Sequence, residues 1–257
     1  QRIKDFGRYL ETIRPLLAGN EGLLNVDSGP AAGTTSPIRH IMPDKGFVNF
    51  EQHIPMYVSG FGPKSLALAG EYGDGAVIAL AVNSDSMNFV WHALEEGARQ
   101  AGRTLDRETF KTTALTAITV LDDGEAVDSE RVKSECGAMA MAAVHYAYDQ
   151  WRNFGHQPPN HLAEIWEDYT AMLEKVPAER RHQRIHAGHN CWVLPEEEKF
   201  LTPKVLTSSS LIGTRDQIIE TLSELSKGGL HQVMVLPNFD TRYENLERLG
   251  KDLIGTV

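Results

Sequence analysis

A glycine-rich turn between an apolar segment and a helical pattern is the clearest candidate for binding chemistry. Residues 59–65 read Ser-Gly-Phe-Gly-Pro-Lys-Ser and follow the apolar segment Ile54–Val58. Pro63 suits the first position of a helix, where a backbone N–H would have no partner anyway. The N–H groups of Lys64 and Ser65 would then point out of the helix start and, with the helix dipole, favour an anion such as phosphate.

Different residues of this turn would contribute differently to such an anion site. Gly60 and Gly62 would let the backbone approach the anion closely. Lys64 could add positive charge, and the Ser65 hydroxyl could be a further donor. A βα turn that binds nothing is the alternative, since glycine-rich turns are common. The predicted anion site comprises Ser59, Gly60, Phe61, Gly62, Pro63, Lys64 and Ser65.

The elements around the turn predict a parallel βαβ unit. Ile54–Val58 is typical of a buried strand, 63–73 has helical spacing, and Ala76–Leu80 is a second apolar strand. A strand, a helix and a strand in so short a stretch imply a right-handed crossover between parallel strands. Ligands bind at the C-terminal ends of such strands, which is where the turn lies.

The same alternation continues through the chain and predicts an α/β fold with a parallel sheet. Thr214–Gln217 is a capping-box pattern that starts a helix. The stretch 20–44 is rich in Gly, Pro, Ser and Thr and predicts a long irregular loop. Further helices are predicted over 2–19, 86–101, 127–154, 162–176 and 243–254, and further strands over 112–121 and 232–236.

Composition excludes some classes of partner. The 257 residues carry a net charge of -10, which argues against nucleic acid and against an anionic membrane surface. No apolar run approaches the ~20 residues of a membrane-spanning helix. Cys136 and Cys191 make no disulfide framework, so we expect a cytoplasmic protein with a small-molecule substrate. The chain opens on Gln1, not Met, so we expect it to begin after residues of a longer protein.

Two further clusters are weaker candidates. His182, His186, His189 and Cys191 lie within a short stretch, but their spacing matches no closed zinc site, and we expect no metal there. His186 and His189 are weak candidates for orienting a substrate. His145, Tyr146, Tyr148 and Trp151 share one predicted helix, where core packing is favoured over lining a cofactor or substrate pocket.

Residues 54–78 resemble the core motif of the luciferase-like monooxygenase superfamily. They combine an Ile-Pro-x-Tyr strand, a Gly-Pro helix start, Leu-Ala-Gly, and Asp-Gly before the next strand. The stretch from Leu211 to Pro237 resembles the closing helix and last strand of the family, and 2–19 is similar to the helix before its central loop. His186-Ala-Gly-His189 resembles a short motif in one branch.

The resemblance implies an eight-stranded (β/α)8 TIM-type barrel with a helical insertion before the last strands. We therefore expect residues 1–257 to be the C-terminal part of one barrel domain, with the insertion at 137–205. Roughly a hundred residues of a complete barrel would precede the chain, and they would carry the first strands and the usual acid/base side chains. Catalytic residues are accordingly unknown.

The resemblance also implies a cofactor whose phosphate is held by residues 59–65, either FMN or the deazaflavin coenzyme F-420. The leading expectation is a monooxygenase that uses reduced FMN and oxygen on a small organic substrate. A deazaflavin-dependent hydride-transfer reductase or dehydrogenase and a non-catalytic flavin-binding protein are the alternatives, and a homodimer is left open. The apolar run Ala79–Val82 favours a less polar substrate over a sugar phosphate.

Overall fold

The structure is a computed structural model that describes residues 2–26, 29–78 and 83–255. The chain divides into two compact units, the first made of residues 1–79, 87–113 and 229–232, and the second of the remaining segments. Among the described residues no helix is long and apolar enough to cross a membrane. The predicted single barrel domain with an insertion at 137–205 stays a prediction.

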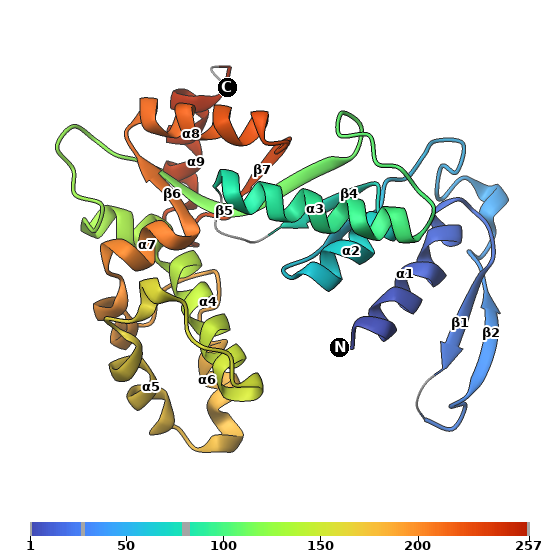
Figure 1. Cartoon of the computed structure of the whole chain (residues 1–257), viewed down its shortest axis with the longest axis horizontal. Coiled ribbons are helices and arrows are strands. Elements are labelled where there is room, and N and C mark those ends of the chain that lie inside the picture. Colours follow the sequence, from blue (N-terminus) through green and yellow to red (C-terminus); the bar gives the residue numbers. More distant parts are fainter. Residues whose placement is uncertain (1, 27–28, 79–82, 256–257) are drawn as a thin grey trace. The chain divides into compact units, whose positions relative to one another are not determined.

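The first unit contains a β-hairpin, a long amphipathic helix and a parallel βαβ unit (Figure 1). Its elements are α1 (Ile3–Leu17), β1 (Gly22–Val26), β2 (Thr34–Ile38), the 3-10 turn η1 (Pro43–Lys45), β3 (Tyr57–Ser59), α2 (Pro63–Tyr72), β4 (Gly75–Ile78), most of α3 (Ser84–Gln100) and the start of β5 (Lys111–Val120).

The hairpin replaces much of the loop that we predicted over 20–44, so that prediction is wrong. β1 and β2 pair antiparallel, from Gly22 opposite Ile38 to Val26 opposite Thr34. The Thr12 hydroxyl of α1 donates to the Leu23 carbonyl at 2.7 Å and fixes the hairpin to the helix. Strand propensity depends on the pairing partner more than on composition, which explains the error.

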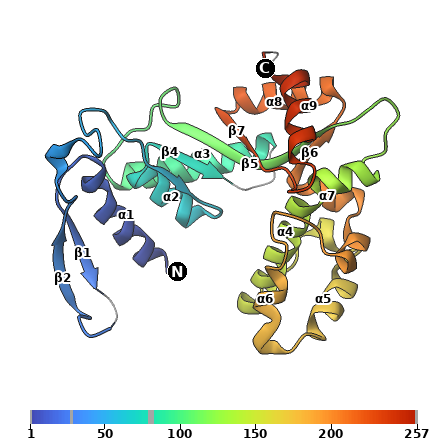
Figure 2. The ribbon, with the colours of Figure 1, turned by 180° about the vertical axis from the view of Figure 1, so that it is seen from behind.

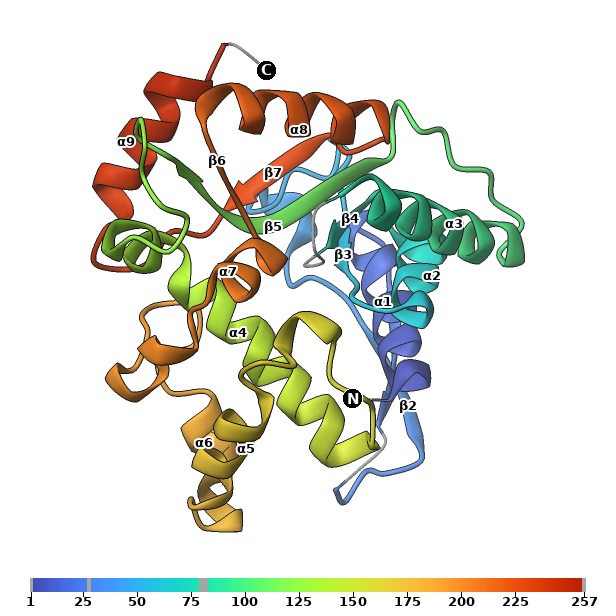
Figure 3. The same ribbon diagram turned by 60° about the vertical axis from the view of Figure 1, so that its left-hand side comes forward.

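The βαβ unit has shorter strands than expected. β3 and β4 lie side by side in Figure 3 and pair in parallel, with Tyr57 opposite Gly75 and Ser59 opposite Val77. Ile54 and Pro55 lie outside the ladder, where the missing N–H of proline costs no hydrogen bond. The predicted end of the second strand, with the run 79–82, lies outside the described residues.

The second unit combines the rest of β5 with a largely helical segment and the closing elements (Figure 2). These are α4 (Glu130–Phe154), η2 (Asn160–Leu162), α5 (Trp166–Glu174), η3 (Ala178–Arg180), α6 (Arg181–Ile185), η4 (Pro195–Phe200), α7 (Pro203–Ser209), β6 (Ser210–Gly213), α8 (Arg215–Lys227), β7 (Gln232–Val235) and α9 (Arg242–Leu253).

The predicted strands 112–121 and 232–236 appear as β5 and β7, whereas β6 was not predicted as a strand. β5 and β6 are parallel, with Val120 opposite Gly213, and β7 pairs with β5. The capping box before α8 is present, because Gln217 N–H donates to the Thr214 hydroxyl and Thr214 N–H donates to the Gln217 side chain at 2.9 Å. The predicted helix 162–176 is instead a 3-10 turn followed by the shorter helix α5.

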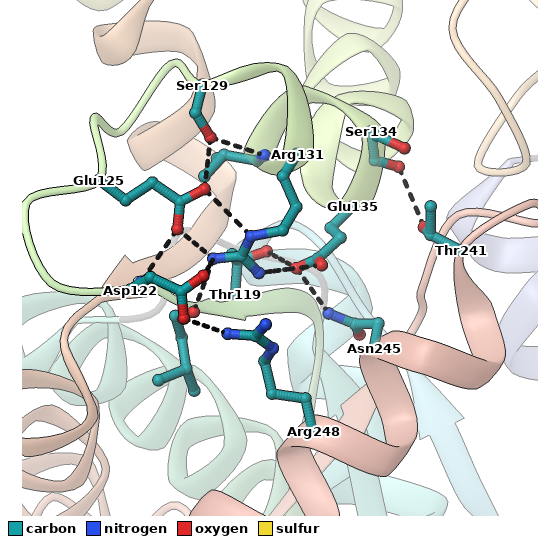
Figure 4. A network of polar contacts seen from close by, with 12 residues as sticks. Thr119, Asp122, Glu125, Ser129, Arg131, Ser134, Glu135, Thr241, Asn245 and Arg248 are labelled. Atoms are coloured by element: carbon teal, nitrogen blue, oxygen red, sulfur yellow. Dashed lines mark hydrogen bonds and ion pairs between the residues drawn. The ribbon is translucent and has the colours of Figure 1, made fainter.

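A polar network joins the end of β5 to α4 and α9 (Figure 4). The Glu135 carboxylate, on a residue only 5% exposed, accepts from the Thr119 hydroxyl, from Asn245 Nδ2 and from Arg131. Arg131 also donates to Glu125 and to the Val120 carbonyl. Ion pairs and hydrogen bonds therefore anchor both helices to the strand end.

Candidate functional site

The predicted anion site is a β3–α2 turn that opens directly onto a helix start. β3 ends at Ser59, and Gly62 is the N-cap of α2 with an extended backbone (φ -130°, ψ 170°). Pro63 occupies the first helical position as expected. The Gly62 carbonyl accepts the first helical hydrogen bond, from Leu66 N–H at 3.0 Å.

The Ser65 side chain closes the turn. Its Oγ accepts from the N–H groups of Phe61 and Gly62 at 3.1 and 3.2 Å, and it donates to the Gly62 carbonyl at 3.0 Å. The single hydroxyl proton is thus used within the turn, whereas we predicted it as a donor to an anion. Its contribution in the structure is to shape the turn.

Two backbone donors remain at the start of α2. In the described part of the chain no acceptor meets the N–H groups of Lys64 and Ser65. The Lys64 side chain is exposed and forms no ion pair with any residue in the described part of the chain. Two outward N–H groups, a helix dipole and a nearby ammonium are the elements of an anion site.

The two glycines of the turn differ in what they allow. A Cβ on Gly60 would lie 2.9 Å from the Leu66 nitrogen, so this glycine is needed for the close fold of the turn. A Cβ on Gly62 would meet nothing within 4 Å. The backbone of Gly62 therefore faces open space beside the helix start, where a phosphate-sized group can approach.

α2 is held rigidly by α3. A Cβ on Gly70 would lie 1.9 Å from the Leu94 carbonyl oxygen, and one on Gly97 would lie 1.9 Å from the Ala67 carbonyl oxygen. The two helix backbones therefore touch at these glycines. Leu66 and Ala69 are fully buried on the same helix. Close packing therefore fixes α2 against α3.

The opposite end of α2 is fixed by charged residues that the sequence did not single out. The Arg103 guanidinium donates to the carbonyls of Gly70, Glu71 and Gly73 at 2.6 to 3.1 Å, which satisfies the C-terminal carbonyls of the helix. Only tertiary contact brings Arg103 there, because it lies about 30 residues further along the chain.

Asp74 anchors the same turn to α1. It accepts from Met56 N–H at 2.8 Å and forms a two-point ion pair with Arg14, one contact of which is 2.8 Å long. Burial would raise the pKa of the Asp74 carboxyl, but the hydrogen bonds from Arg14 and Met56 hold it below its ordinary value. The Asp-Gly dipeptide signalled a turn in the sequence but gave no sign of this ion pair.

The weaker histidine candidates lie in the second unit. The rings of His186 and His189 meet at 5.3 Å between centroids. Among the described residues no group of three or more His, Cys, Asp or Glu side chains is placed to hold a metal ion. Contacts among the described residues do not assign His186 or His189 to a substrate, so that role stays a prediction.

The aromatic cluster on α4 separates into buried and exposed members. His145 and Tyr148 are 3% and 1% exposed and belong to the helical core, which confirms core packing for these two. Tyr146 is 53% exposed on the opposite face. Trp151 is partly buried and packs against the same core, with its ring 5.9 Å from that of Trp166.

Solved structures share this fold. The chain superposes on the coenzyme F-420-dependent tetrahydromethanopterin reductase from Methanopyrus kandleri with a TM-score of 0.55 at 19% identity, over 98% of this chain and 62% of that one. An F-420-dependent secondary alcohol dehydrogenase in complex with an F-420–acetone adduct gives 0.50 at 15% identity, over 96% and 60%. These likenesses confirm the predicted α/β fold of the TIM-barrel type.

Curated relatives and a family model match as well. The chain is 28% identical over 202 residues to the 5,10-methylenetetrahydromethanopterin reductase of Archaeoglobus fulgidus and 25% identical over 203 residues to that of Methanopyrus kandleri. Each match covers 78% of this chain but only 54% and 50% of the relatives, so the chain spans about half their length. Residues 2–232 match the family model described as luciferase-like monooxygenase.

Proposed function

Because this chain belongs to the luciferase-like monooxygenase family, we propose that it is the cofactor-anchoring part of a flavin-type oxidoreductase. The observation that carries the proposal is the start of α2, where the N–H groups of Lys64 and Ser65 have no acceptor among the described residues and Gly62 leaves open space. This donor set fits a phosphate monoester or diester, which both FMN and the deazaflavin coenzyme carry.

The deazaflavin alternative is favoured over the FMN monooxygenase that led the sequence-based expectations. Both superposable structures described above are F-420-dependent by name, and both curated relatives are reductases. When bound, a deazaflavin supplies two-electron hydride chemistry, so the reaction proposed is reduction or oxidation of a small organic substrate without oxygen. The cytoplasmic location stays a prediction, and a homodimer stays open.

In that proposal the residues of this chain bind the cofactor phosphate and orient the cofactor. Lys64 and Ser65 hold the phosphate through their N–H groups, and the Lys64 ammonium adds charge. The Ser65 hydroxyl keeps the turn in its binding shape, and contacts of Gly70 and Gly97 between α2 and α3 fix the helix direction. A rigid anchor of this kind limits where the reactive end of a cofactor can lie.

The absorption spectrum of the intact purified protein tests the cofactor assignment. A band near roughly 420 nm is expected for a deazaflavin, and one near roughly 450 nm would point to FMN and to the monooxygenase. A protein that binds either cofactor but transfers no hydride and activates no oxygen would be the non-catalytic binder. A protein that binds neither cofactor would overturn the proposed function.

A pair of isosteric variants tests the phosphate anchor. Gly62→Asp places a carboxylate in the open space at the N-cap, where it stabilises the helix but repels an anion. Gly62→Asn has the same size and capping ability without the charge. We expect the Asp variant to fold with at least wild-type stability and to lose cofactor affinity at least about 100-fold relative to the Asn variant, as a few kcal/mol of charge repulsion implies. Equal affinities in titrations would refute the anchor.

A further inference from the structure

A cavity of about 400 Å³ lies in the first unit, at the N-terminal ends of three neighbouring strands. Tyr57, Gly75 and Lys111 are the first residues of β3, β4 and β5, which are adjacent in the sheet. The proposed cofactor anchor instead follows Ser59, at the other end of β3. The volume lies within the ~300–1,000 Å³ of small-molecule sites, so the cavity can hold a ligand of its own.

The missing side chain of Gly75 brings two lining residues to one place. Tyr57 lies opposite Gly75 in the parallel pairing of β3 and β4. A Cβ on Gly75 would lie 2.9 Å from Tyr57 Cε1 and 2.5 Å from the Lys111 carbonyl oxygen, so the Tyr57 ring lies over Gly75 beside the start of β5. The other apolar lining residues are Pro55, Leu105 and Phe110. The cavity therefore has an aromatic and apolar wall next to Lys111.

The charged lining residues differ in how far their charges are neutralised. The Asp74 carboxylate is paired with Arg14, and the Arg103 guanidinium is engaged with carbonyls at the end of α2. Lys111 Nζ donates to the Glu108 carbonyl at 2.6 Å, but no carboxylate in the described ranges pairs with it. An ammonium has three donors, so two N–H groups of Lys111 and its charge stay available for a ligand.

Asp106 is the remaining carboxylate of the lining, and it is engaged with its own turn. Its Oδ1 accepts from Glu108 N–H at 2.9 Å, and its carbonyl accepts from Phe110 N–H at 2.9 Å. Outside the neutral pair of Asp74 with its arginine, two cations of the lining, Arg103 and Lys111, face the single anion Asp106. The lining therefore carries a net positive charge and favours an anionic ligand over a cationic one.

We propose that this cavity binds a small aryl carboxylate, with the ligand ring against Tyr57 and its carboxylate on the Lys111 ammonium. The Tyr57 side chain is 39% exposed, so its ring is accessible for stacking. The hydroxyls of Thr104 and Thr109 line the same cavity and are donors that a carboxylate can accept from. The site does not depend on the proposed oxidoreductase function, because it uses no residue of the anchor.

Three probes of similar shape and different charge test the proposal. Benzoate, benzamide and benzylamine are titrated into the intact protein near neutral pH by isothermal titration calorimetry. We expect benzoate to bind at least about 10-fold more tightly than benzamide, because only benzoate forms a charged hydrogen bond with Lys111, and benzylamine to bind most weakly. No detectable binding of benzoate, equal affinities of benzoate and benzamide, or tightest binding of benzylamine would overturn the proposal.

A pair of lysine variants locates the binding. Lys111→Met removes the ammonium but keeps most of the apolar stem, and Lys64→Met is the matched control at the cofactor anchor. We expect the affinity for benzoate to fall at least about 10-fold in Lys111→Met and to stay at the wild-type value in Lys64→Met. An unchanged affinity in Lys111→Met, or a loss in Lys64→Met as large as that in Lys111→Met, would overturn the site.

A measurement on the wild-type protein decides the matter if Lys111→Met does not fold. In a titration of the isotope-labelled protein followed by nuclear magnetic resonance, benzoate is expected to shift the amide signals of Thr104, Thr109 and Lys111. Shifts confined to Gly62, Lys64 and neighbouring residues of the anchor, or no shifts in either place, would overturn the assignment.

Discussion

Substitution of Arg131 by Met should destabilise the second unit more than any surface charge change. Arg131 donates to Glu125, to Glu135 and to the Val120 carbonyl, and its side chain is 25% exposed (Figure 4). Methionine keeps most of the apolar stem of the side chain but removes the guanidinium, which leaves the Glu135 carboxylate, on a side chain 6% exposed, without its cation. Removing one partner of a buried pair costs about 3–5 kcal/mol.

The unfolding free energy lost in Arg131→Met should become smaller at low pH. The Arg131 hydrogen bond, with weaker help from Asp122 N–H and Ser129, lowers the pKa of Glu125 from 4.5 to about 2 despite partial burial. A carboxyl whose pKa is depressed by folding adds stability above its unfolded pKa, and that stability is lost as pH falls toward the folded value. The gap between wild type and Arg131→Met should therefore be full above about pH 4.5 and should narrow toward about pH 2.

Urea unfolding of both proteins at a series of pH values measures this gap. Arg248→Met is the matched control, since its ion pair with Asp122 is 34% and 62% exposed and should contribute at most about 1 kcal/mol. The expected difference in unfolding free energy at pH 7 is about 3–5 kcal/mol for Arg131→Met. A loss of unfolding free energy no greater than that of the control would refute the reasoning. So would a difference between wild type and Arg131→Met that stays constant down to about pH 2.5, which lies inside the titration range of Glu125.

Two further substitutions test packing and capping. Gly70→Ala places a methyl group against the Leu94 carbonyl, so we expect a loss of about 1–3 kcal/mol in unfolding free energy. The control Gly250→Ala, with open space around it in α9, should be neutral or stabilising. Equal effects of the two substitutions in thermal melts would contradict the backbone contact of α2 and α3. Thr214→Ala removes the N-cap acceptor of α8 and should lower the unfolding free energy by about 1 kcal/mol in urea unfolding, whereas Thr214→Ser should retain most of the stability. An unchanged urea midpoint for the Ala variant would count against the capping box.

Local spacing determined the elements whose residues are close in the chain. The start of α2 at Pro63 and the capping box at Thr214 appear where the sequence placed them, because an N-cap and its partners are three residues apart. α4 also begins beside its Ser129 cap, three residues after the predicted start at 127. These features depend on backbone geometry that a few neighbouring residues fix by themselves.

Other features were decided only when distant segments met. The Arg14–Asp74 pair joins residues 60 apart, and the His145–Glu197 pair joins residues 52 apart, with no local signal for either. The β1–β2 hairpin was missed because its strands gain stability from each other and from α1 and not from composition.

The glycine-rich turn shows both levels in one place. Sequence alone determined that a helix start follows a strand here, since Gly62 and Pro63 are local signals, and it predicted an anion site at that helix start. Tertiary structure decided that the Ser65 hydroxyl is used within the turn, that Gly60 packs against the helix, and that Gly62 alone faces open space. The physical reason is that hydrogen-bond saturation and free volume depend on every neighbour in space, which a linear pattern does not specify.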